Sequence, residues 1–158
     1  MTQTESTPVA PRPLTDADLS HLLATQRFGV LSTVKRSGHP HQSTVMYHWN
    51  PDERVIRIST TTDRLKARHV RANPRISLHV TGPSIWSFAV AEGDAEVSEV
   101  TTEPGDATSR ELLAITPGFA DPAEEAAFLR RQVDEQRVVI RLPVTRLYGT
   151  ALDLPAAD

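Results

Sequence analysis

Cysteine is absent from the 158 residues of this chain. The protein therefore has no disulfide, no thiolate nucleophile and no thiolate metal ligand, so any redox chemistry must come from a cofactor. The sequence also has no apolar run near the roughly 20 residues that a membrane-spanning helix needs. Its first residues lack the basic and then apolar layout of a secretory signal. We expect a cytoplasmic protein that does not bind membranes.

Strong charge of either sign is also lacking, because the formal net charge is −3 and the pI is about 6.1. Aromatic residues make up only 5% of the chain and do not interleave with a basic stripe, which disfavours nucleic-acid binding. The common nucleophile, zinc-protease and nucleotide-loop motifs are missing. The histidines at 39, 41 and 48 do not converge as ligands, so we expect no metal site. The sequence leaves the catalytic residues unknown.

Hydrophobic periodicity predicts mostly strands. The expected strands cover residues 27–34, 41–49, 54–60, 75–81, 84–100 and 137–149, the last as one or two strands. Helical patterns occur at residues 16–26, 109–115 and 122–136, with Thr15 or Asp16 as the cap of the first helix. Gly93 lies in the middle of the longest strand segment, where we expect a bulge or sharp bend.

Consecutive strands with short turns indicate a mainly antiparallel β-barrel with peripheral helices. The length suits one domain, and we place it at residues 14–150. Residues 1–13 are polar and rich in proline, and residues 151–158 are similar in character. We expect both segments to be disordered tails.

The segment TTDRLKARHVRANPR, residues 61–75, holds five of the 17 lysine and arginine residues. We expect a short helix, capped by Thr62 or Asp63 and ended by Asn73-Pro74. The cations follow a strand end rich in hydroxyl groups, at the start of a helix where free backbone N–H groups favour anions. A solvated helix face and nucleic-acid binding are the alternatives, but the position favours an anion site, with phosphate as its ligand.

Three segments then resemble a known family: RFGVLSTVKRSGHPHQSTVMYHWNP, RVIRISTTTDRLKARHVRANPRISLHV and WSFAVAEGDAEV. They are similar to the split β-barrel flavin and deazaflavin proteins related to pyridoxamine 5′-phosphate oxidase. The WSFAVAEG segment is most similar to the branch that uses coenzyme F420, a deazaflavin. The resemblance covers about residues 14–150 and implies an antiparallel split β-barrel, of the kind that binds FMN, with peripheral helices.

The resemblance also implies a set of cofactor-binding residues. Ser59, Arg64 and Lys66 would hold the cofactor phosphate, with Thr60 and Thr61 as neighbouring hydroxyl donors. The strand Ser43, Thr44, Val45 and Met46 would lie along the tricyclic ring. Trp86 and Phe88 would come from the second subunit of a homodimer. The family usually has Asn where this chain has His69.

The function implied is hydride transfer from reduced coenzyme F420 to a small conjugated or quinone-like organic acceptor. Two alternatives stay open: an FMN-binding oxidoreductase of the same fold, and a non-enzymatic F420-binding carrier. Tyr47 and His48 are candidates for supplying a proton. Arg68 and Arg71 either line the path of the long anionic cofactor tail or face water, and Arg57 could neutralise that tail.

Overall fold

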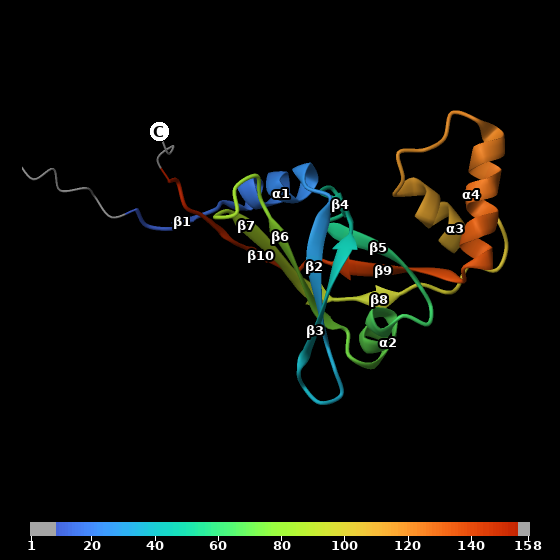
Figure 1. Cartoon of the computed structure of the whole chain (residues 1–158), viewed down its shortest axis with the longest axis horizontal. Helices are drawn as coiled ribbons and strands as arrows, with labels where there is room; N and C mark the ends of the chain where they lie inside the picture. The colour runs from blue at the N-terminus through green and yellow to red at the C-terminus, as the bar shows by residue number, and fades with distance from the viewer. Residues whose placement is uncertain (1–8, 155–158) are drawn as a thin grey trace, which may run out of the picture.

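A computed structural model describes residues 9–154 of the chain (Figure 1). Its helices are α1 (Asp16–Thr25), α2 (Leu65–Ala72), α3 (Ala107–Ala114) and α4 (Pro122–Asp134). Its longer strands are β2 (Phe28–Val34), β3 (Pro40–Met46), β5 (Val55–Thr61), β6 (Arg75–Thr81), β7 (Phe88–Asp94) and β9 (Arg137–Pro143). The short strands are β1 (Arg12–Pro13), β4 (His48–Asn50), β8 (Glu96–Val97), β10 (Arg146–Tyr148) and β11 (Thr150–Ala151).

Two main sheets form the body of the molecule. The five-stranded sheet has the order β10-β7-β6-β2-β3, and the four-stranded sheet has the order β4-β5-β9-β8. Every strand pair in them is antiparallel. This confirms the predicted antiparallel fold with peripheral helices.

The chain passes between the two sheets three times within almost continuous strands. It goes from β3 to β4 through Tyr47, from β7 to β8 through Ala95, and from β9 to β10 through residues 144–145. Gly93 lies at the second crossing, and a Cβ atom there would be only 2.2 Å from the Pro143 carbonyl oxygen. Glycine is needed because β7 and β9 approach so closely, and the chain leaves the ladder two residues later.

The core lies between the sheets and is closed on one side by α1. Ile56, Ile140 and Leu78 are fully buried within it, and Leu19 and Leu23 bring the apolar face of α1 onto it. Each such side chain contributes roughly 1.5–3 kcal/mol of transfer free energy. The predicted cap of α1 is confirmed: Thr15 and Asp18 form a reciprocal capping box, which fixes the start of the helix.

Strand pairing continues beyond the expected domain limits of residues 14–150, where β1 and β11 form a small two-stranded sheet. Arg12 and Pro13, which the sequence assigned to the N-terminal tail, pair with Ala151 and Thr150. The rest of the expected tails, residues 1–8 and 155–158, lies outside the described residues. Within residues 9–154, none of the helices has the length and apolar character required to traverse a membrane.

Candidate functional site

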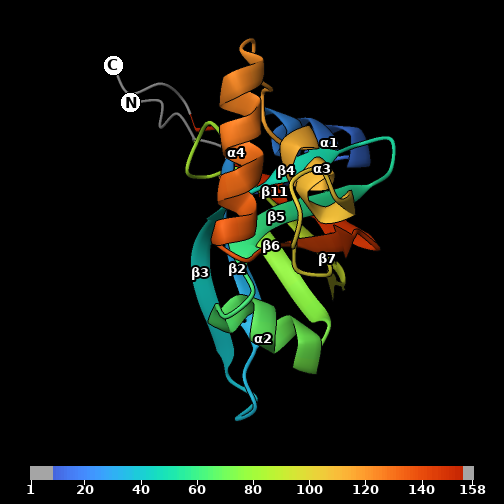
Figure 2. The ribbon, with the colours of Figure 1, turned by 90° about the vertical axis from the view of Figure 1, so that its right-hand side faces the viewer.

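A cavity of about 480 Å³ opens beside the four-stranded sheet. Its walls come from the end of β3, β4, β5, the start of α2, the start of β9, and the helices α3 and α4. Figure 2 shows α3 and α4 in front of β5, with α2 below them. The strands form one wall of the cavity, and α2, α3 and α4 form the other walls.

Part of the expected cofactor site lines this cavity. Thr44, Val45 and Met46 come from β3, Ser59 comes from β5, and Lys66 lies in the first turn of α2. They are separated by up to 22 positions along the chain. The structure therefore brings the predicted ring-binding strand and two of the predicted phosphate ligands to one cavity.

Other expected site residues do not line it. Thr60 is buried and, because strand side chains alternate, points to the face opposite Ser59. Thr61 donates a hydrogen bond to the Asp63 carboxylate. Arg64 is exposed in the residue before α2, and Ser43 keeps a buried hydroxyl oxygen that has no hydrogen-bond partner among the described residues.

Trp86 and Phe88 also lie outside the cavity wall of this chain. Trp86 is 54% exposed in the connection between β6 and β7. Phe88 begins β7 and stacks on His79, with ring centroids 5.2 Å apart. Their expected role on a second subunit stays a prediction.

Positive charge gathers at one end of the cavity. Lys66 lies there with Arg137, whose Nη1 donates to the Ser59 hydroxyl over 3.3 Å and whose Nε binds Glu135. Burial, and then the nearby charges of Arg64 and Arg137, lower the pKa of Lys66 below its usual range. The two arginines repel the lysine charge, and a bound anion would relieve this repulsion.

Arg137 was missed from the sequence. It begins β9 and pairs with Thr61 across the ladder, 76 positions away in the chain. Only the pairing of β5 with β9 brings it beside Ser59 and Lys66, so no local motif could have identified it.

The entry to α2 differs from the expected one. The helix begins at Leu65 with Arg64 in the cap position, and no side chain caps it. Instead, Arg71 reaches back and donates to the Thr62 carbonyl and hydroxyl oxygens, each over 2.8 Å. Arg71 therefore closes the loop before the helix, and Arg68 is exposed.

His69 connects α2 to the five-stranded sheet. Its Nδ1 lies 2.9 Å from the hydroxyl of Thr33, which is almost fully buried on β2. The ring also packs edge-on against His41, with centroids 5.0 Å apart. Burial, and then the charges of His41, Lys35 and Arg68, lower the pKa of His69. The residue that departs from the family pattern holds the helix in place.

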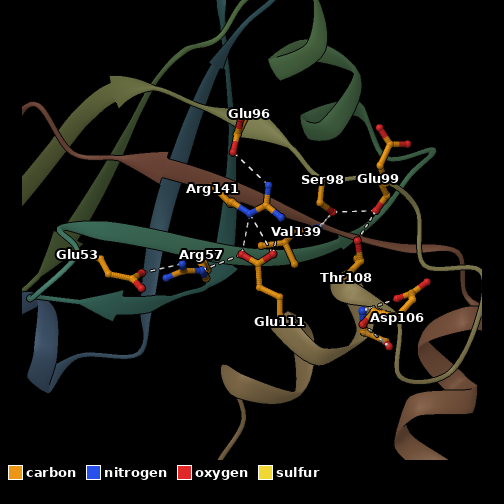
Figure 3. A network of polar contacts seen from close by, with 11 residues as sticks. Glu53, Arg57, Glu96, Ser98, Glu99, Asp106, Thr108, Glu111, Val139 and Arg141 are labelled. Carbon is orange, nitrogen blue, oxygen red and sulfur yellow. Dashed lines mark hydrogen bonds and ion pairs between the residues drawn. The ribbon is translucent and has the colours of Figure 1, made fainter.

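An ion network fixes α3 beside the cavity (Figure 3). Glu111 of α3 binds Arg57 of β5 at 2.8 Å and Arg141 of β9 at 2.7 Å. Burial opposes ionisation of Glu111, but the hydrogen bonds from Arg141 and Arg57 outweigh it and lower the pKa of the carboxyl. Glu53 and Glu96 bind the same two arginines from the other side.

The two candidate proton donors have different surroundings. The Tyr47 hydroxyl donates to the Leu23 carbonyl oxygen over 2.7 Å, and burial raises its pKa well above the usual range. His48 lines the cavity, and its Nδ1 is buried without a hydrogen-bond partner among the described residues. Tyr47 thus has a structural hydrogen bond, whereas His48 has a free ring nitrogen.

The cavity fits a cofactor with a flat ring and an anionic group. The half-buried Lys66 and Arg137 suit a phosphate, and His48, which lines the cavity, keeps a buried Nδ1 without a hydrogen-bond partner in the described chain. Such atoms usually signal a missing ligand or water. Within residues 9–154 no group of three metal-ligating side chains is assembled.

Comparisons with solved structures give the same fold. A conserved hypothetical protein from Mycobacterium tuberculosis is 20% identical, with a TM-score of 0.71, and the match covers 99% of this chain and 96% of that one. An FAD-binding protein from Mesorhizobium loti is 20% identical, with a TM-score of 0.61 and coverages of 89% and 96%. A structure named F420 reductase is 27% identical, with a TM-score of 0.56 and coverages of 81% and 94%.

A family model gives the remaining comparison. It matches residues 15–151, which include every strand of both main sheets and all four described helices. Its description is pyridoxamine 5′-phosphate oxidase. The chain belongs to the pyridoxamine 5′-phosphate oxidase family.

Proposed function

We propose that the protein is an oxidoreductase that binds coenzyme F420 in this cavity. The reduced cofactor would supply a hydride to a small conjugated or quinone-like organic acceptor. The observation that carries the proposal is the cationic end of the cavity, where Lys66 has no ion pair among the described residues. Lys66, Arg137 and Ser59 would hold the cofactor phosphate, with Arg64 nearby.

The ring would lie along Thr44, Val45 and Met46 on the end of β3. Since β3 is the edge strand of its sheet, it has backbone groups without a strand partner, which are available to the polar edges of a ring. The family membership supports a flavin or deazaflavin cofactor. The likeness to the structure named F420 reductase, at 27% identity, supports the deazaflavin.

The protein would act as a homodimer. Phe28 and Met46 are cross-strand partners on β2 and β3 and are 57% and 59% exposed. Val30 and Thr44 are the next pair on the same face. This apolar face therefore adjoins the ring-binding strand, so a partner subunit seated on it would close the site with its own Trp86 and Phe88.

FMN is the second candidate cofactor, and one observation favours it. The cationic cluster is compact, and the exposed Arg71 is bound to Thr62. A single terminal phosphate needs only such a compact site, whereas the long anionic tail of F420 gains from cations spread along a path.

A titration separates the two cofactors. We expect the purified protein to bind coenzyme F420 more tightly than FMN when ring fluorescence is followed. Tighter binding of FMN would overturn the cofactor assignment. Binding of F420 without any oxidation of its reduced form by a panel of enones and quinones would leave a carrier and contradict the reductase.

A further inference from the structure

His48 has an unusual combination of position and bonding. It lies on β4, lines the cavity, and keeps a buried Nδ1 that has no hydrogen-bond partner in the described part of the chain. A buried polar atom without a partner costs about 1–3 kcal/mol. Such a cost is commonly retained where the group serves a ligand or a reaction.

The register of β4 and β5 sets where His48 lies along the cavity. His48 is the cross-strand partner of Arg57, and Ser59 is two residues further along β5. Two residues of strand span about 7 Å. His48 is therefore about two strand residues away from the level of Ser59, and it lies two residues after the strand β3 that would carry the ring.

The other polar groups near this position are already engaged. Tyr47 donates its hydroxyl to the Leu23 carbonyl oxygen. Arg57 binds Glu53 and Glu111, so its charge is balanced by two carboxylates. Leu112 of α3 and Ile115, the residue after α3, supply apolar side chains to the cavity wall. Of the three neighbours Tyr47, His48 and Arg57 on this wall, His48 is thus the one with no side-chain hydrogen bond in the described part of the chain.

We propose that His48 is the catalytic acid that protonates the acceptor. The inference rests on the proposed function, since the hydride must come from the reduced cofactor. Hydride adds to the β-carbon of an enone, the C=C electron pair moves to give an enolate, and the imidazolium form of His48 transfers one N–H proton to that enolate and becomes neutral imidazole. The imidazole then regains a proton from water, which restores the enzyme and leaves a saturated ketone.

If His48 is the acid, its contribution to the rate should depend on the chemical class of the acceptor. Reduction of an enone produces a strongly basic enolate, whereas hydride addition to a quinone produces a much weaker base, the hydroquinone monoanion. Proton transfer by a positioned side chain commonly contributes about 10²–10⁴-fold to the rate. The contribution should be large for enones and small for quinones.

The kinetic test uses the full-length protein with reduced F420, or with reduced FMN if the titration selects it. His48→Asn and His48→Gln should lower kcat for cyclohexenone by about 100-fold while the cofactor affinity and kcat for menadione change little. His21→Asn, an exposed histidine on α1, is the matched control and should behave as wild type. Equal losses for both acceptors, or loss of cofactor binding, would overturn the role of His48.

A second measurement does not depend on turnover. In the wild-type protein without cofactor, the ring resonances of His48 should shift on addition of cyclohexenone, while those of His21 stay fixed. This arm also decides the matter if both His48 variants fail to fold. If F420 and FMN both fail to bind, the proposed function fails. If a cofactor binds and supports turnover but His48 neither shifts nor affects enone reduction, only the present inference fails.

Discussion

Lys66 differs from the other cations of its segment in what surrounds it. It is partly buried in the cavity wall, and its charge is disfavoured by desolvation and by Arg64 and Arg137. Arg71, by contrast, is held by Thr62. A cation kept near other cations without an acidic partner in the described chain is poorly placed for stability and well placed for an anionic ligand.

We predict that Lys66→Ala weakens cofactor binding by at least about 1.5 kcal/mol, or roughly tenfold in Kd, because a charge-assisted hydrogen bond is lost. Fluorescence titration of the cofactor measures the change. Lys35→Ala, at the exposed turn between β2 and β3, is the control and should leave the affinity unchanged. An unaltered Kd for Lys66→Ala would mean that the phosphate binds elsewhere.

Sequence reasoning placed only some of the cavity residues. Ser59 and Lys66 could be identified because they flank one strand-to-helix connection, and both line the cavity. Arg137 could not, since its place depends on strand pairing with Thr61. The hydrogen bond of His69 could not be predicted either, because its partner Thr33 lies on a strand 36 positions earlier in the chain.

At the scale of elements, α3 and α4 decide the shape of the cavity. Neither helix buries a continuous apolar stripe, and Gln132 is the one fully buried side chain of α4. What holds α3 to the sheet is the ion network of Glu111 with Arg57 and Arg141. The wall of the cavity therefore depends on charge as well as on apolar packing.

We predict that Glu111→Gln lowers the free energy of unfolding by about 2 kcal/mol at neutral pH, because it leaves two partly buried arginines without their shared carboxylate. Denaturant unfolding at pH 7 measures this loss. Glu99→Gln changes an exposed carboxylate and should have almost no effect. A loss no larger than that of Glu99→Gln would contradict the assigned role of the network.

We also predict that the stability lost in Glu111→Gln depends on pH. The folded-state pKa of Glu111 is lowered, so its contribution is present above its unfolded pKa of about 4.3 and is lost as pH falls through the folded value. The difference in stability between wild type and Glu111→Gln should therefore shrink in acid. A difference that stays constant down to pH values of about 2 would contradict the linkage.

Element boundaries could be predicted where the pattern was strong and local. Thr15 at the cap of α1 and the helix that ends before Asn73 and Pro74 were both found in this way. The strands β1 and β11 were missed because two residues have no period. Residues 104–136 carried two helical patterns but no motif, so nothing in the sequence indicated that these helices cover a cavity.

For the whole molecule, the exposed face of the five-stranded sheet carries an apolar patch next to the proposed ring site. Phe28 and Met46 are apolar, adjacent and more than half exposed, and Thr44 of the proposed ring site shares their face. Large exposed apolar residues in contact with one another commonly mark an interface.

We predict that Phe28→Glu converts the proposed homodimer to monomers and weakens cofactor binding with it, because each charge would be buried without a partner in an apolar interface. Analytical ultracentrifugation of wild type and variant measures the first effect, and the fluorescence titration measures the second. A wild-type monomer that binds the cofactor with full affinity would contradict the dimer.

The split-barrel architecture itself was predicted through resemblance more than through periodicity. Local patterns predicted most strands, but which strands join into which sheet depends on contacts such as those of β2 with β6 and β5 with β9. Three crossings of the chain connect the two sheets of the split barrel. Only Gly93 among these crossing points had a visible signal in the sequence.

The segment that carries α3 and α4 leaves the sheet and returns to it at neighbouring positions. Ser98 exchanges hydrogen bonds with Val139, and the Thr101 amide binds the Arg137 carbonyl oxygen. The ends of this excursion are therefore already joined, and each doubling of its length costs only about 0.6 kcal/mol in closure entropy. Residues 102–136 can thus change in length at little entropic cost while the strands β5 and β9, which flank the cavity, stay paired.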